Sequence, residues 1–101
     1  MVNGVFYCAY KLKKGVDVAE FLEASKKLND GHISKQKGYI SWKQLNDGDT
    51  WADFATFETI EDVKKFEENS ADPCELAQKF YSFINLNSCK QHHFTIERNY
   101  E

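Results

Sequence analysis

The chain has 101 residues, of which 42% are hydrophobic and 15% aromatic, with only five glycines and one proline. This composition predicts one folded domain over residues 1–101 and excludes a disordered chain, which lacks the apolar area to offset chain entropy. The net charge of −3 excludes the large basic surface that nucleic acid or an anionic membrane would attract.

The first strand is expected at residues 5–12, where β-forming and apolar residues are almost continuous. Asp17 is placed to cap a helix in which apolar residues recur at helical spacing over the next four turns. Residues 39–45 and 50–57 alternate in polarity, which is typical of half-buried strands. Because Asp47–Gly48 lies between them, these two strands are predicted to form a hairpin.

The second half of the chain predicts two short helices and a last strand. Thr59 and Asp62 resemble a capping box that opens the first of these helices. Asp72 is expected to cap the second, with Pro73 at its first position and the helix running to residue 84. Residues 89–96 form the predicted final strand.

The resulting order, β-α-β-β-α-α-β, predicts the α+β class with ferredoxin-like topology, in which two β-α-β halves are joined through a hairpin. Right-handed crossovers place all helices on one face of a four-stranded antiparallel sheet. The other face is then bare, and a bare apolar face would be an aggregation hazard. We therefore expect a homodimer, formed by a self-complementary two-fold contact.

Side-chain parity predicts which residues occupy each face of the sheet. On the first strand we expect Phe6, Cys8, Tyr10 and Leu12 under the helices. The bare face is expected to carry the following side chains: Val5, Tyr7, Ala9, Tyr39, Ser41, Trp51, Asp53, Ala55, Phe57, Gln91 and His93.

Four segments carry a resemblance to a known family: residues 38–41, 51–63, 80–84 and 93–96. With them the chain resembles the dimeric α+β barrel superfamily, and within it the antibiotic-biosynthesis-monooxygenase-like group. The resemblance implies two ferredoxin-like subunits whose sheets face each other across a barrel-like interior. Members include cofactor-independent monooxygenases that act on aromatic polyketides, quinol monooxygenases, heme-degrading enzymes and proteins without a known activity. The late helical His of the heme-degrading enzymes has no counterpart in residues 73–84, so heme degradation is not expected.

The candidate site follows from the parity assignment. Tyr7, Tyr39, Ser41, Trp51 and Gln91 are predicted to bind a small aromatic ligand. Asp53 and His93 are the predicted catalytic pair, in which the carboxylate orients the imidazole. In an oxygenase of this kind His93 would remove a phenolic proton, and the electron-rich anion would react with dioxygen.

Two other functional classes stay open at this point. The same interior could bind a small molecule without turnover, or side chains could fill it and leave a structural dimer. Asp53 could equally form a hydrogen bond with the backbone or with a Tyr of the partner subunit. His93 could simply form hydrogen bonds with polar neighbours and have no catalytic role.

The three cysteines, Cys8, Cys74 and Cys89, have no metal-ligand or C-x-x-C spacing. We therefore expect no metal and no redox pair, in a reduced compartment. The resemblance to cofactor-independent monooxygenases implies that no cofactor is bound. Because neither a leader nor a membrane-spanning run is recognisable, the expected location is the cytoplasm.

Overall fold

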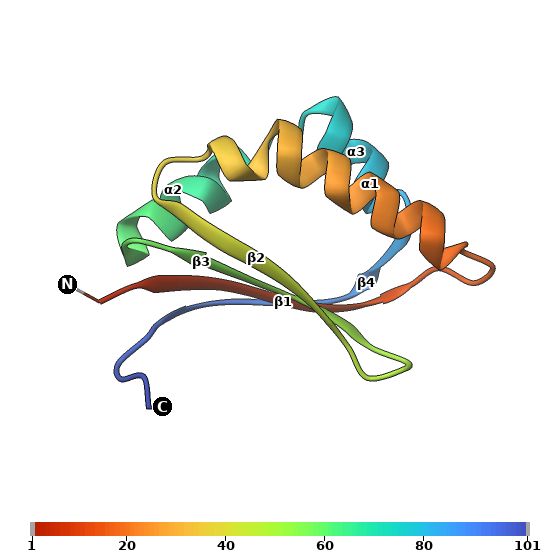
Figure 1. Ribbon diagram of the computed structural model, residues 1–101. Helices are drawn as coiled ribbons and strands as arrows, with labels where there is room; N and C mark the ends of the chain where they lie inside the picture. Colours follow the sequence, from red (N-terminus) through yellow and green to blue (C-terminus); the bar gives the residue numbers. More distant parts are fainter. Residues whose placement is uncertain (1, 101) are drawn as a thin grey trace.

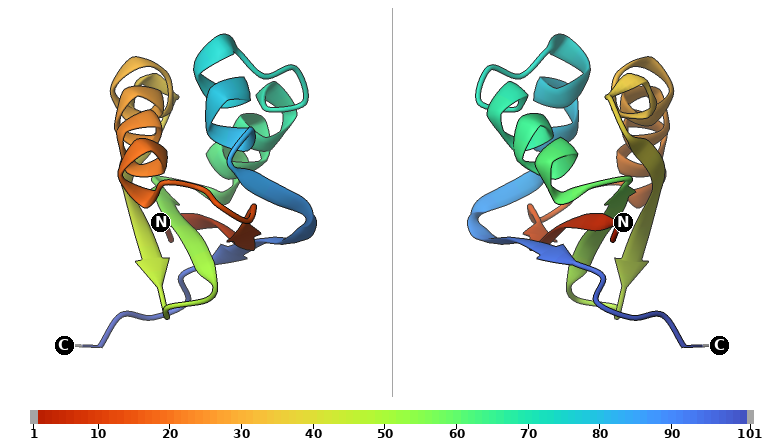
Figure 2. Two further views of the ribbon diagram at one scale, coloured as in Figure 1. Left: turned by 90° about the vertical axis from the view of Figure 1, so that its right-hand side faces the viewer. Right: turned by 90° about the vertical axis from the view of Figure 1, so that its left-hand side faces the viewer.

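Four antiparallel strands form one sheet, and the helices cover one of its faces (Figures 1 and 2). The computed structural model describes residues 2–100. Its elements are β1 (Gly4–Leu12), α1 (Val18–Gly31), the 3-10 turn η1 (Ile33–Lys35), β2 (Tyr39–Asn46), β3 (Trp51–Phe57), α2 (Ile60–Asn69), α3 (Glu75–Tyr81) and β4 (Ile84–Thr95). The strand order is β2-β3-β1-β4, so the predicted α+β, ferredoxin-like topology is confirmed. Within residues 2–100, no helix combines the length and apolarity that crossing a membrane requires.

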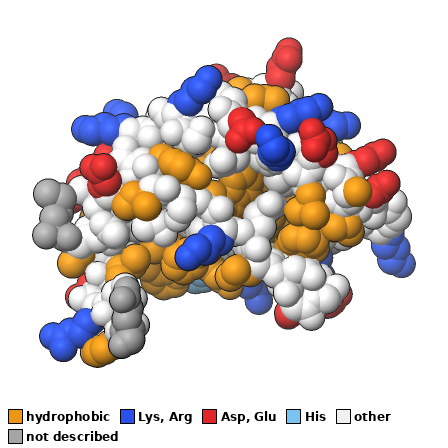
Figure 3. All heavy atoms as spheres, in the orientation of Figure 1, with side chains coloured by type: hydrophobic (Ala, Val, Ile, Leu, Met, Phe, Trp, Pro, Cys, Tyr) orange, Lys and Arg blue, Asp and Glu red, His pale blue; other side chains and the backbone are white. Residues whose placement is uncertain are grey.

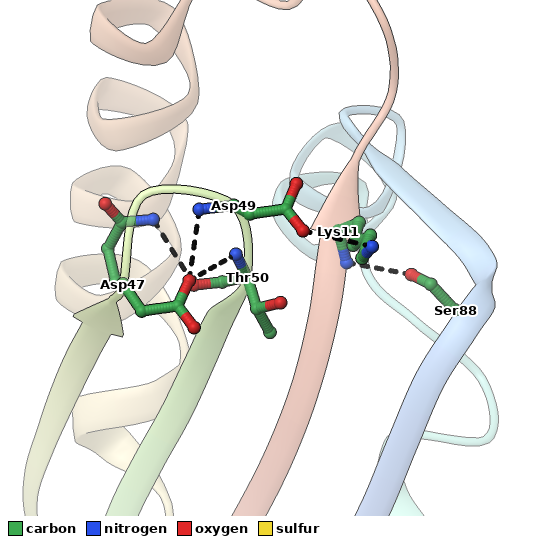
Figure 4. Close-up of polar contacts among 6 residues, drawn as sticks. Lys11, Asp47, Asp49, Thr50 and Ser88 are labelled. Atoms are coloured by element: carbon green, nitrogen blue, oxygen red, sulfur yellow. Dashed lines mark hydrogen bonds and ion pairs between the residues drawn. The ribbon is translucent and has the colours of Figure 1, made fainter.

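The predicted capping and turn residues form local hydrogen bonds in three places. The Asp17 side chain accepts a hydrogen bond from the Ala19 backbone at the start of α1. In the hairpin, Asp47 Oδ1 accepts from the backbone of both Asp49 and Thr50 (Figure 4). Gly48 of this turn adopts φ +102°. Thr59 caps α2 in the same way as Asp17 caps α1. These turns set the directions in which α1, β3 and α2 leave them.

The core lies between the sheet and the helices, where an aromatic cluster dominates. Phe21 of α1 stacks on Phe80 of α3 with ring centroids 5.4 Å apart. The sheet meets them with Tyr10 of β1, and the prediction that Phe6, Cys8, Tyr10 and Leu12 lie under the helices is confirmed. Aromatic pairs of this kind add about 0.5–1.5 kcal/mol each beyond the area they bury.

The region around α3 differs from its prediction. The helix begins at Glu75, with Cys74 at the N-cap position and no side-chain cap, so the Asp72 cap is wrong. The strand β4 begins at Ile84 instead of residue 89, because Ile84 pairs with Leu12 at the end of β1. Ile84 therefore reaches the core from a strand and not from the helix stripe.

The parity assignment of β3 is wrong. Trp51 pairs with Tyr10, and Ala55 pairs with Phe6, so this side of β3 lies under the helices. Asp53 shares that face, where Tyr10 supplies a hydrogen-bond partner. A carboxyl group can occupy this buried side because it has such a partner.

The assignments of β4 and of Tyr39 are also reversed. Gln91 pairs with Cys8 and His93 pairs with Phe6, which places both under the helices. Tyr39 lies on that side too, because its hydroxyl bonds Asn29 of α1 at 3.0 Å. The reason is again a polar partner, which here comes from a helix: Asn29 of α1 for Tyr39, and Glu67 of α2 for Gln91 and His93.

Candidate functional site

A cavity of about 280 Å³ lies between the sheet and the helices. Aromatic rings form much of its wall, and its polar groups are few. The lining residues that bear on function are Phe6, Tyr10, Trp42, Asp53, Phe80 and Tyr81. The volume is near the lower end of the roughly 300–1,000 Å³ typical of ligand pockets, which suits a small planar molecule.

The cavity opens beside a bulge in β4. Ala9 pairs with Lys90, but Lys11 pairs with Asn85, so residues 86–89 leave the regular ladder. Ser88 holds this bulge, since its hydroxyl accepts from the Lys11 backbone at 2.8 Å (Figure 4). The lining residues Leu86, Cys89 and Gln91 are all exposed and belong to β4. The mouth of the cavity therefore lies at the β4 edge.

Asp53 is the one carboxyl group among the residues that line this cavity. It is only 6% exposed, and the Tyr10 hydroxyl donates to its Oδ1 at 2.8 Å. Burial raises the pKa of Asp53 to about 7, although hydrogen bonding to Tyr10 and then to Trp42 opposes the rise. A carboxyl group with this pKa exchanges a proton readily near neutral pH, as a general base must.

Tyr10 stays protonated beside that carboxylate. Burial, followed by the charge of Asp53, raises the pKa of the Tyr10 phenol well above its ordinary value. Gln44 lies on the same face of the sheet and donates to Ser25 of α1 at 3.0 Å. Tyr10 is thus a fixed donor that orients Asp53 without competing for the proton.

A second cluster of polar side chains lies where α2 packs against β4. Glu67 Oε2 accepts from Gln91 at 2.8 Å, and Glu67 Oε1 lies 3.1 Å from His93 Nδ1. That buried Oε1 has a hydrogen-bond donor when His93 carries its proton on Nδ1. His93 therefore faces Glu67, whereas Asp53 bonds Tyr10, so the predicted Asp53–His93 contact is wrong.

The seven predicted site residues fall into three groups. Asp53 and Gln91 line the cavity. Trp51, Tyr39 and His93 lie on the helix side but contact Phe21, Asn29 and Glu67 respectively. Tyr7 and Ser41 lie on the bare face, as their pairing with Phe54 and Thr56 shows. Their predicted gathering in one space is wrong, because it rested on the reversed faces of β3 and β4.

Sequence reasoning missed the contributions of Tyr10, Trp42 and Tyr81 to the cavity. Tyr10 is predicted under the helices, so a correct parity for β3 places Asp53 on the same face, diagonally across the β1–β3 ladder from Tyr10. Tyr81 comes from α3, and no strand pattern points to it. Across residues 2–100, no group of three or more His, Cys, Asp or Glu side chains is arranged to hold a metal ion.

No protein-family model matches the sequence, and no curated protein matches it. Solved structures do share the fold. A mutant of SnoaB, a cofactor-independent oxygenase from Streptomyces nogalater, superposes with TM-score 0.73 at 13% identity over 96% of this chain and 95% of that one. A putative antibiotic biosynthesis monooxygenase from Nitrosomonas europaea gives TM-score 0.67 at 12% identity over 94% and 90%.

A dimeric protein of unknown function with a ferredoxin-like fold, from Bacteroides fragilis, gives TM-score 0.60 at 17% identity over 93% and 96%. These likenesses extend over nearly the whole chain, so the chain shares its ferredoxin-like fold with these structures. Because one fold hosts many activities, the reaction has to be argued from the cavity itself.

Proposed function

We propose that the protein is a monooxygenase that oxidises a small phenolic or enolic aromatic with dioxygen and without a cofactor. The observation that carries this proposal is Asp53, a buried carboxyl group with a pKa near 7 inside an aromatic-walled cavity. Keeping a carboxylate there is unfavourable for folding, so its presence favours a chemical role. The fold shared with a cofactor-independent oxygenase supports the same reaction class.

Binding would use the ring walls of the cavity. Phe6 and Phe80 offer apolar surfaces for a planar ring, and Trp42 of β2 lies opposite Ala55 of β3. The ionisable hydroxyl of the ligand would point toward Asp53, the acceptor at the inner wall. A small ring system fits the volume of about 280 Å³, and its entry route is the β4 mouth.

The proposed reaction starts when the Asp53 carboxylate takes the phenolic proton. The substrate anion gives one electron to dioxygen, and recombination of the two radicals forms a carbon–oxygen bond to a peroxide. When the O–O bond breaks, one oxygen stays on the ring carbon as a carbonyl and the other leaves as water. That water carries the phenolic hydrogen and the hydrogen of the reacting carbon, so the substrate itself supplies all the electrons.

The test is dioxygen uptake with phenol, 1-naphthol and anthrone, which offer increasing numbers of fused rings. We expect catalysed uptake with at least one of them, and incorporation of one ¹⁸O atom per product from ¹⁸O₂. Asp53→Asn should lower kcat at least 100-fold, since it removes the base. Asp49→Asn is the matched control, because that exposed carboxylate lies in the hairpin turn and leaves the cavity untouched.

Saturable binding of these aromatics without turnover would favour a non-catalytic binding protein. The cavity itself is the observation that supports this second candidate. Full activity in the Asp53→Asn variant would overturn the assignment of the base.

We further infer that the working form is a homodimer joined through the bare sheet face. This face carries Tyr7 packed on His92 and Phe94, while Leu45 and Phe94 are about half exposed. Hydrophobic side chains extend to the lower rim of the molecule in Figure 3, on the side away from the helices. Sedimentation velocity should give a dimer for the native chain and a monomer for Phe94→Asp; a native monomer would contradict the inference.

A further inference from the structure

Two of the three cysteines meet at the mouth of the cavity. Cys8 belongs to β1 and Cys89 to the bulge of β4, and both line the same cavity. Since Cys8 pairs with Gln91, Cys89 lies diagonally across the β1–β4 ladder on the same face of the sheet. The two side chains therefore point to the same face of the sheet and lie on neighbouring strands, although 81 positions separate them in the sequence.

The two thiols differ in access to solvent. Cys8 is buried at 9% exposure, whereas Cys89 is exposed. An oxidant can therefore reach Cys89 first, and Cys8 is placed to react with the product. Cys74, the third cysteine, is the N-cap residue of α3 and is not among the residues that line the cavity.

From this arrangement we propose that Cys8 and Cys89 form a reversible disulfide across the mouth of the cavity, so that the protein carries a redox modification site. The oxidant is a low-molecular-weight disulfide such as oxidised glutathione. This inference is independent of what the cavity binds, and it revises the expectation that the chain holds no redox pair.

The exchange balances in two steps. The Cys89 thiolate attacks one sulfur of oxidised glutathione, forming a mixed disulfide and releasing one glutathione thiolate. The Cys8 thiolate then attacks the Cys89 sulfur, forming the Cys8–Cys89 bond and releasing the second glutathione. Two electrons pass from the protein thiols to the oxidant, and the two released thiolates take up the two protons.

The rate should depend strongly on pH, because only the thiolate reacts. Burial raises the pKa of Cys8 to about 12 and also raises the pKa of Cys89. Thiolates are therefore scarce at neutral pH, and we expect the rate of closure to rise about tenfold for each pH unit between 7 and 9. Mixed disulfide at Cys89 should accumulate when Cys8 is replaced.

The test treats the full chain with oxidised glutathione at pH 8.5 and measures the intact mass and the cross-linked peptides. The native chain and the matched control Cys74→Ser should both lose the mass of two hydrogen atoms, with Cys8 joined to Cys89. Cys89→Ser should form no internal disulfide, and Cys8→Ser should stop at the glutathione adduct. Hydrogen exchange at residues 86–90 should slow in the oxidised native chain, because the bond anchors the bulge to β1.

Dithiothreitol should restore the reduced mass and the faster exchange. Cross-links that involve Cys74, an unchanged mass after oxidation, or equal closure in Cys89→Ser would each overturn the proposal. Because none of these measurements uses a substrate, they stand or fall separately from the proposed oxygenase activity.

Discussion

Replacing Asp53 by Asn should stabilise the protein at high pH and destabilise it at low pH. The pKa of Asp53 in the folded protein is raised from 3.8 to about 7, mainly by burial, so the folded state binds this proton more tightly than the unfolded state. The stability contributed by the protonated form is fully present below pH 3.8 and is lost as the pH rises through about 7. The rise in pKa corresponds to a destabilisation of about 4 kcal/mol once Asp53 is charged.

Asparagine removes that charge but brings an amide group that lacks an obvious acceptor beside Tyr10, which costs about 1–3 kcal/mol. At pH 8 the variant should therefore be more stable than the native chain by about 2 kcal/mol. For a chain of this size that is a rise in Tm of about 10 °C. At pH 4 the charge is absent from both proteins, so the variant should be less stable by about 2 kcal/mol.

Thermal and urea unfolding at pH 4, 6 and 8 measure this difference, with Asp49→Asn as the exposed control. The expected signature is a change of sign in the stability difference between Asp53→Asn and the native chain. A difference that is the same at all three pH values would refute the argument, because it would mean that Asp53 has an ordinary pKa in the folded protein.

Tyr10→Phe should move the pH profile of kcat upward by about one unit, because the Tyr10 hydrogen bond lowers the pKa of Asp53. An unchanged profile would show that this hydrogen bond does not affect the pKa of Asp53. Leu86→Trp should raise KM for 1-naphthol about tenfold with little change in Tm, since Leu86 is 60% exposed at the mouth, whereas a fall in Tm would indicate a packing role. His93→Ala should retain most of kcat, because His93 faces Glu67; loss of turnover with an intact fold would return the role of base to His93.

The order of elements and the strand topology could be predicted from local signals, because caps, turn residues and hydrophobic periodicity act within a few residues. Asp17, Thr59 and the turn at Asp47–Gly48 all act as expected. The start of β4 was harder to predict, because Ile84 belongs to the strand through its pairing with Leu12, which is far away in the chain. No local pattern records that pairing.

The site could be predicted only in part, because it depends on which way each strand faces. Asp53 and Gln91 were identified as functional candidates and do line the cavity. Their polarity argued for the bare face, yet Tyr10 and Glu67 satisfy them beneath the helices. A polar side chain on a strand does not indicate which face of the sheet it occupies until its hydrogen-bond partner is known. These partners come from other elements of the fold.

The ionisation of Asp53 can be followed directly by ¹³C NMR of the aspartate carboxyl carbons between pH 3 and 9, with Asp53→Asn used to assign the signal. We expect one carboxyl that titrates near pH 7 in the free protein and shifts when 1-naphthol fills the cavity. An Asp53 carboxyl that titrates near 4 and ignores the ligand would contradict the claim that this cavity holds a functional base.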